Sequence, residues 1–131
     1  MNFSIVLYES PYTMNTLFHF FKIANAIVDN GDSLSVLLYA DSTYFSLTSL
    51  DVASDEFNYS EEIDFLISKG VTFYLCETAL KKRGIYDLYD KNMKLSSLSE
   101  FSKIISESDR VINLWVLLSL LKTFPLKMLK K

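Results

Sequence analysis

Short runs of apolar and β-prone residues without a helical period mark the strands of this chain. The first run covers residues 3–8 and stops at a Glu-Ser-Pro segment, and residues 34–39 repeat the pattern. Residues 71–75 and 110–114 follow it as well. This pattern is typical of strands that are buried on both faces, as in a parallel sheet.

Segments with helical spacing separate these runs. The first predicted helix ends at Gly31 and has one apolar face, formed by Leu17, Phe20, Phe21, Ala24, Ile27 and Val28. Capping boxes at residues 58–61 and 97–100 predict the starts of two more helices, the first of which ends at Gly70. Gly84 closes a short helix after the third strand. The opening order of strand, helix and strand predicts a parallel pair with a right-handed crossover, and therefore an α/β fold.

Residues 40–57 form the longest segment with neither period, and they are rich in Ser, Thr and Asp. Loops of this length inside a compact domain often bind partners. The aromatic residues in and beside it, Tyr44, Phe45, Phe57 and Tyr59, belong either to the domain's own packing or to a subunit interface. We favour the interface. Residues 85–95 are polar and give no clear prediction.

The last residues, 115–131, are apolar and then basic, with Pro125 interrupting them. We expect a helix packed on the sheet, although an amphipathic helix on a membrane or a partner is an alternative. The apolar run at residues 114–121 is too short to span a bilayer.

Composition narrows the possible functions. The 131 residues carry 13 Lys and Arg against 16 Asp and Glu, and a net charge of −3 disfavours direct binding of nucleic acid. One Cys and one His cannot form a disulfide or a zinc site, so we expect a cytoplasmic protein with no metal. The amino-terminal segment lacks the basic start of a signal peptide. No glycine-rich phosphate loop follows any strand, so no cofactor is expected, and no serine-hydrolase or zinc-protease motif is present.

Cys76 is the candidate catalytic residue. It follows the third predicted strand, and ligands of open parallel sheets gather at the carboxyl ends of the strands. The short helix that begins after it would favour the thiolate. A small buried hydrophobe is an equally good interpretation of a lone Cys. Without a second Cys or a redox cofactor, the thiol could still accept and release a persulfide sulfur, which requires an accessible sulfur and a docking surface rather than a deep pocket.

Other polar residues near this point carry weaker signals. The cluster Lys81, Lys82 and Arg83 could dock an acidic carrier or stabilise a persulfide anion, but cations at a helix end usually need no further reason. Ser10 and Tyr12 could border the same crevice, and turn chemistry explains them about as well. His19 falls on the polar side of the first helix, and we expect it to be solvated and without a role.

The segment at residues 71–85 resembles the active-Cys segment of the DsrE-like sulfur-carrier family, most closely its TusD branch. Residues 11–12, 47–49, 53–57 and 109–111 show similar motifs in the same order. The resemblance covers residues 1–113, a DsrE/TusD-like domain, and leaves 114–131 as a carboxyl-terminal extension. The segment between Gly84 and Ser97 looks shorter than in that branch.

The resemblance implies a three-layer flavodoxin-like fold with a mainly parallel sheet and helices on both faces. It also implies a sulfurtransferase subunit in a heterohexamer with TusB-like and TusC-like subunits. Cys76 would take persulfide sulfur from a TusA-like donor and pass it to a TusE-like acceptor, in the relay for 2-thiouridine at tRNA wobble positions. Two alternatives stay open, a non-catalytic DsrE-like scaffold subunit and a DsrE homologue in sulfur oxidation. A flavodoxin-like small-ligand binder would need a phosphate site that the first turn lacks.

Overall fold

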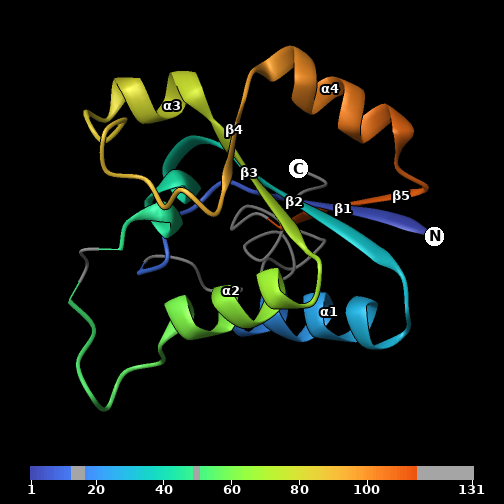
Figure 1. Ribbon diagram of the computed structural model, residues 1–131, viewed down its shortest axis with the longest axis horizontal. Helices are drawn as coiled ribbons and strands as arrows, with labels where there is room; N and C mark the ends of the chain where they lie inside the picture. Colours follow the sequence, from blue (N-terminus) through green and yellow to red (C-terminus); the bar gives the residue numbers. More distant parts are fainter. Residues whose placement is uncertain (13–16, 49–50, 115–131) are drawn as a thin grey trace, which may run out of the picture.

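The computed structural model describes residues 1–12, 17–48 and 51–114 of the chain. This part of the protein contains five strands and their helices, and Figure 1 shows how they are arranged. The elements are, in order, β1 (Asn2–Leu7), α1 (Leu17–Asp29), β2 (Ser33–Leu38), the 3₁₀ helix η1 (Ala40–Ser46), α2 (Tyr59–Ser68), β3 (Thr72–Cys76), α3 (Glu77–Lys82), β4 (Lys94–Ser96), α4 (Leu98–Glu107) and β5 (Arg110–Leu114).

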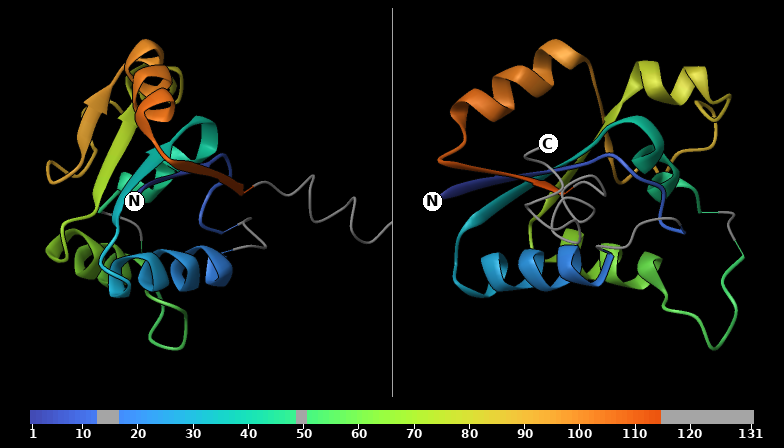
Figure 2. Two further views of the ribbon diagram at one scale, coloured as in Figure 1. Left: turned by 90° about the vertical axis from the view of Figure 1, so that its right-hand side faces the viewer. Right: turned by 180° about the vertical axis from the view of Figure 1, so that it is seen from behind.

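The strands form one sheet in the order β4-β3-β2-β1-β5, and every neighbouring pair is parallel. Helices α1 and α2 lie on one side of this sheet, and α3 and α4 lie on the other (Figures 1 and 2). The chain moves in one direction across the sheet as far as β4 and then returns through α4 to β5, the strand at the opposite edge. The predicted three-layer α/β fold with helices on both faces is confirmed.

The two faces of the sheet have separate cores because side chains alternate along each strand. Ile5 and Leu7 belong to the larger core, under α1 and α2, together with the buried face of α1 that the helical spacing predicts. Val6 and Leu37 belong to a smaller core under α3 and α4, with Phe101 as the one buried residue of α4. The α4 side of the sheet therefore has much the thinner apolar layer.

The predicted capping residues are confirmed by their hydrogen bonds. The Asn58 Oδ1 atom accepts from the Glu61 N–H at 3.3 Å, and the Ser97 hydroxyl accepts from the Glu100 N–H at 3.2 Å. Gly70 follows the end of α2 with a φ of 96°, a backbone angle that side chains disfavour. These caps fix where α2 and α4 begin and thereby set the lengths of the loops that precede them.

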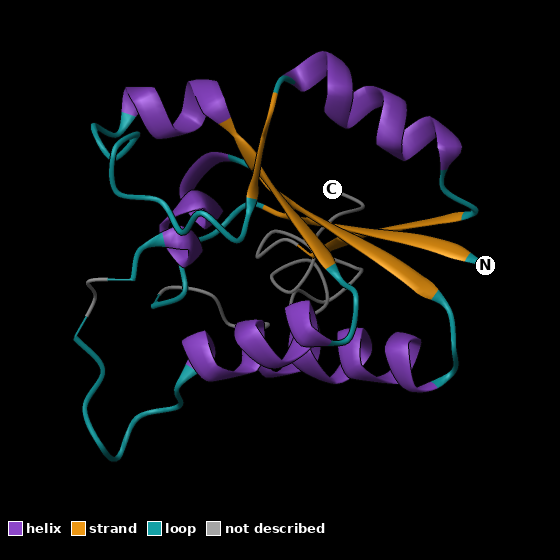
Figure 3. Cartoon of the chain, in the orientation of Figure 1, coloured by secondary structure: helices purple, strands orange, loops and turns teal. Residues whose placement is uncertain are grey.

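The segment at residues 40–57 is not wholly irregular, because its first part is η1. Three hydroxyl side chains of η1 donate to backbone oxygens: Ser42 to Leu7 and Tyr39, Thr43 to Ala40, and Ser46 to Thr43. Such local bonds let a Ser/Thr-rich sequence form a compact turn without an apolar period. Strand β4 was also missed, since three residues are too few to show a pattern. Figure 3 shows both elements, η1 as helix and β4 as strand.

The interface assignment of the loop aromatics is wrong for Phe45 and Tyr59. Both are buried in the larger core, where their rings meet edge to face at 5.5 Å between centroids. Tyr44 and Phe57 are half-buried and pack against the same core. The domain's own packing therefore accounts for this group.

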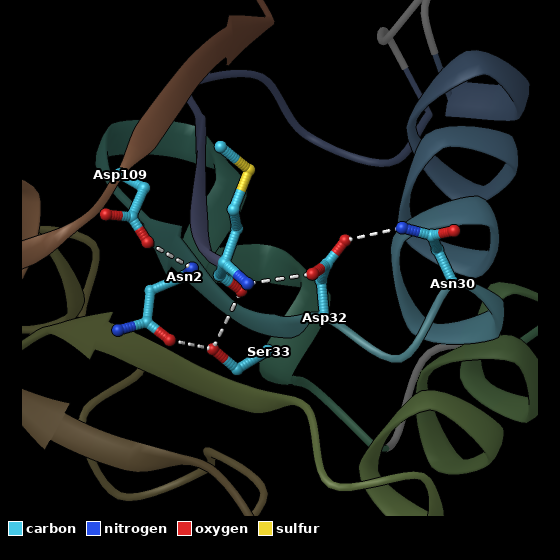
Figure 4. A network of polar contacts seen from close by, with 6 residues as sticks. Asn2, Asn30, Asp32, Ser33 and Asp109 are labelled. Atoms are coloured by element: carbon cyan, nitrogen blue, oxygen red, sulfur yellow. Dashed lines mark hydrogen bonds and ion pairs between the residues drawn. The ribbon is translucent and has the colours of Figure 1, made fainter.

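A polar network joins the amino-terminal ends of β1, β2 and β5 (Figure 4). The amine of Met1 lies 2.8 Å from Asp32 Oδ1, and Asn30 donates to the other oxygen of that carboxylate. The Asn2 N–H donates to Asp109 at 2.7 Å. The bond to Asp32 raises the pKa of the amine, and the same contact lowers the pKa of the Asp32 carboxyl. The network therefore lies at the end of the sheet where the strands begin, and Cys76 lies at the other end, where β3 finishes.

One expectation concerns residues that the structure does not describe. The predicted helix in the extension falls on residues 115–131, which lie outside the described part of the chain. Within the described part, no helix has both the length and the apolar character needed to cross a bilayer.

Candidate functional site

Cys76 is the last residue of β3 and the N-cap residue of α3, which begins at Glu77. The alternation along β3 places Leu75 in the larger core and Cys76 in the smaller one, with Ala79 and Phe101. The neighbouring strand β4 pairs Ser96 with Cys76. Helices α3 and α4 start beside each other at this end of the sheet (Figure 1), and each supplies a buried residue to the apolar cluster of Cys76.

The thiol is not exposed, which corrects the expectation of an accessible sulfur. Cys76 retains only 2% of its possible exposure. Cys76 occupies the cap position of α3, but its side chain makes no capping hydrogen bond. The short helix therefore surrounds the sulfur without bonding to it in this state.

A pocket of about 200 Å³ nevertheless reaches Cys76 from the surface. Its walls come from the end of β2 and the start of η1, from α3 and the residue that follows it, and from the first residue of α4. Besides Cys76, the residues that line the pocket are Tyr39, Ala40, Thr78, Ala79, Lys82, Arg83 and Leu98. The ring of Tyr39 and the half-exposed Leu98 form an apolar rim, and Lys82 and Arg83 add positive charge. The site is therefore a small surface pocket with a buried Cys76 side chain in its wall, rather than an exposed thiol on an open surface.

The three basic residues after Cys76 have different surroundings. Lys81 lies 3.1 Å from Glu77 within α3, and this contact raises the pKa of the Lys81 ammonium. Lys82 lines the pocket and is exposed. Arg83 forms an ion pair with Asp41 of η1, at 2.7 Å between Nη2 and Oδ1. Of the predicted cluster, two members therefore border the Cys76 pocket and one points along its own helix.

The other sequence candidates lie elsewhere. His19 is exposed on α1, as expected from its place on the polar side of the helix. Tyr12 is 58% exposed, and its hydroxyl donates to the backbone oxygen of Asp51. Neither Ser10 nor Tyr12 is among the residues that line the Cys76 pocket. Residues 85–96 do not line it either.

Three pocket residues outside the Cys76 segment, Tyr39, Ala40 and Leu98, were missed by the sequence analysis, and a signal for two of them was present. Tyr39 and Ala40 come directly after β2, the neighbour of β3 in the sheet. The rule that pointed to Cys76, the carboxyl edge of a parallel sheet, applies to these residues equally. Leu98 follows β4, a strand that the sequence did not reveal.

Metal binding has no support in the part of the chain that the structure describes, where no three His, Cys, Asp or Glu side chains gather closely enough to hold an ion. The chemistry of the site rests on the sulfur of Cys76 and the charges of Lys82 and Arg83. A thiolate can attack a sulfur atom of another molecule, and cationic side chains attract anionic molecules to the pocket that they line. The pocket can therefore support sulfur exchange once a second sulfur enters it.

Comparisons with known proteins identify relatives by sequence model and by fold. The model of the DsrE/DsrF-like family matches residues 1–114. No curated protein matches the sequence. Among solved structures, the ychN protein of E. coli is similar with a TM-score of 0.76 and 21% identity, over 86% of this chain and 99% of that one.

Two further structures share the fold at lower similarity. The protein MTH1491 of Methanobacterium thermoautotrophicum, described as of unknown function, has a TM-score of 0.67 and 16% identity, over 86% of this chain and 97% of that one. The conserved protein BT1422 of Bacteroides thetaiotaomicron, also of unknown function, has a TM-score of 0.62 and 11% identity, over 85% and 93%. At these identities the likeness concerns the fold alone.

Proposed function

The chain belongs to the DsrE/DsrF-like family, and from this premise we propose that it is a sulfurtransferase subunit whose Cys76 accepts and passes on persulfide sulfur. The observation that carries the proposal is the position of the only Cys. It ends β3 at the carboxyl edge of a parallel sheet, beneath a pocket that two cationic side chains line. Both features suit a group that takes up and releases an anionic sulfur species.

The proposed reaction consists of two balanced exchanges. In the first, the Cys76 thiolate attacks the outer sulfur of a donor persulfide, R–S–SH, forming Cys76–S–SH and releasing the donor as R–S⁻. In the second, an acceptor thiolate attacks the outer sulfur of Cys76–S–SH, forming the acceptor persulfide and restoring the Cys76 thiolate. One sulfur atom moves in each step, and no external oxidant or reductant is consumed.

The proposed partners follow from the resemblance to the TusD branch. They are TusB-like and TusC-like subunits in a heterohexamer, a TusA-like donor and a TusE-like acceptor in the cytoplasm. The end product would be 2-thiouridine at tRNA wobble positions, with sulfur oxidation as the alternative pathway. Co-purification from the native organism tests this assignment, because TusB-like and TusC-like companions would support it and sulfur-oxidation proteins would replace it.

Persulfide loading followed by intact mass spectrometry tests the chemistry. The purified chain is incubated with a small-molecule persulfide donor, and a Cys76→Ala variant serves as the control. We expect the wild-type chain to gain the mass of one sulfur atom and the variant to gain none. Equal gain in both proteins, or none in the wild type when its folded state is verified, would overturn the proposal.

A scaffold subunit with an inert thiol is the second candidate, and the 2% exposure of Cys76 favours it. Buried cysteines in apolar cores usually act as small hydrophobic residues. A scaffold would fail to load sulfur and would keep its function in cells when Cys76 is replaced by Ala. A sulfur carrier would lose its function in cells when Cys76 is replaced by Ala.

A further inference from the structure

Sulfur exchange at Cys76 requires an opening that the described state does not provide, because the residue is 2% exposed. We propose that the ion pair between Asp41 and Arg83 is a latch that keeps the mouth of the Cys76 pocket narrow. This inference rests on the proposed function, since it concerns the regulation of the same site. Beyond that function, the inference names the interaction whose loss would expose the sulfur of Cys76.

The ion pair joins Arg83, which lines the pocket, to Asp41, which follows the lining residue Ala40. Arg83 follows α3, and Asp41 is the second residue of η1. The Asp41 Oδ1 atom accepts from Arg83 Nε at 2.9 Å and lies 2.7 Å from Arg83 Nη2. The third nitrogen of the same guanidinium, Nη1, donates to the backbone oxygen of Ala79 at 3.1 Å. One planar group thus links the last turn of α3 to η1.

The η1 wall is fixed to the sheet. The Ser42 hydroxyl donates to the backbone oxygen of Leu7 in β1 at 2.7 Å, and Ser42 is fully buried. Ala40, which lies between Tyr39 and the latch, has a φ of 56°, a left-handed angle that costs free energy in any residue with a Cβ. Such an angle persists where the surrounding contacts determine the backbone. Opening therefore requires α3 or Leu98 to move, and Arg83 restrains α3.

The other ion pair of α3 does not have this geometry. Glu77 and Lys81 both belong to α3, so their contact at 3.1 Å leaves the distance between the pocket walls unrestrained. Glu77 is therefore the control for Asp41, since each carboxylate forms one ion pair with a cation of the same segment. Glu77 also accepts a hydrogen bond from the Tyr86 hydroxyl at 3.4 Å, and the side-chain oxygen of Gln can accept the same bond. A carboxylate from a docking protein could replace Asp41 on Arg83 and so couple docking to opening.

The latch is weak because its two side chains are partly exposed to solvent. The Asp41 side chain is 60% exposed and that of Arg83 is 23% exposed. Ion pairs this exposed shift an equilibrium by about two- to fivefold. The latch therefore tunes how often the sulfur is reachable rather than closing the pocket permanently.

The rate of alkylation of Cys76 by iodoacetamide tests the latch. This reagent is small and uncharged, so its approach does not depend on the local field. Rates are compared on the plateau of their pH profiles, where the thiol is fully ionised and a change in ionisation contributes nothing. We expect Asp41→Asn to accelerate alkylation about two- to fivefold and Glu77→Gln to leave the rate within the experimental error of wild type.

Salt provides a second measurement, because it weakens the ion pair in the wild-type protein without any substitution. Raising the ionic strength to about 1 M, where the Debye length is about 3 Å, should accelerate alkylation of the wild type but not of Asp41→Asn. Equal rates for wild type and Asp41→Asn, or equal acceleration by Glu77→Gln, would overturn the latch. Alkylation involves no persulfide, so the latch and the sulfurtransferase proposal can fail independently.

Discussion

The environment of Cys76 predicts a definite order of stability for two conservative variants. The side chain is buried between the sheet and two helices, with Val6, Leu37 and Phe101 in the same apolar cluster. Its sulfur makes no capping bond to α3. Replacement by Ser keeps the size of the side chain and buries a hydroxyl at a position where the sulfur makes no capping hydrogen bond, whereas replacement by Ala removes one buried atom.

The two costs differ in origin and in size. Burying a hydroxyl without a partner costs about 1–3 kcal/mol in protein variants. Removing one buried heavy atom costs about 1 kcal/mol, from lost transfer free energy and the small cavity. We therefore expect Cys76→Ser to lower the free energy of unfolding by about 1 kcal/mol more than Cys76→Ala.

Urea denaturation of the three proteins measures this difference. The slopes of the transitions should agree, so that the shift in midpoint reports stability directly. A Ser variant as stable as the Ala variant, or more stable, would refute the reasoning. Such a result would mean that the N–H groups of α3 reach the side-chain position and cap the hydroxyl. The predicted order also makes Cys76→Ala the sounder control for sulfur loading.

Three further predictions concern Tyr59 and Asp32, which lie outside the pocket. The Tyr59 hydroxyl is buried and has no hydrogen-bond partner among the described residues. We therefore expect Tyr59→Phe to raise the free energy of unfolding, measured by urea denaturation, by about 1 kcal/mol. A lower free energy of unfolding in this variant would show that the hydroxyl does have a hydrogen-bond partner. Burial raises the pKa of Tyr59 above 10.0, so its neutral form contributes stability that declines as the pH rises above 10.0, and this decline should be smaller in Tyr59→Phe. Asp32 has its pKa lowered below 3.8 by the Met1 amine, so its contribution is present above pH 3.8 and is lost as the pH falls through the lowered value. Acid denaturation followed by circular dichroism should therefore show a shallower loss of stability below pH 3.8 for Asp32→Asn, and identical acid profiles would contradict the role of this contact.

Periodicity was sufficient to predict most of the fold. The apolar face of α1 and the caps Asn58 and Ser97 are local signals, and they predicted helices in the places where the structure has them. The last strand, Arg110–Leu114, was predicted with its observed bounds. Local patterns succeed for such elements because burial of one helix face, or of both strand faces, imposes its period on the sequence.

Burial at the site could not be predicted in the same way. The position of Cys76 at the end of β3 followed from the sequence, but its cover depends on Leu98 and Phe101 of α4 and on Tyr39 after β2. These residues approach Cys76 only through the tertiary fold, and β4, which leads into α4, is too short to show a pattern. The ion pair between Asp41 and Arg83 also joins residues that are distant in sequence, so the basic cluster gave no indication of its acidic partner.

The most direct test of the account follows the sulfur through both exchanges on one residue. The chain is loaded with a persulfide donor, separated from it, and then treated with an acceptor thiol, and the peptide that contains Cys76 is analysed by mass spectrometry at each stage. The account predicts one extra sulfur atom on this peptide after loading and its complete loss, with transfer to the acceptor, after treatment. A peptide that stays unmodified throughout, in a chain shown to be folded, would contradict it.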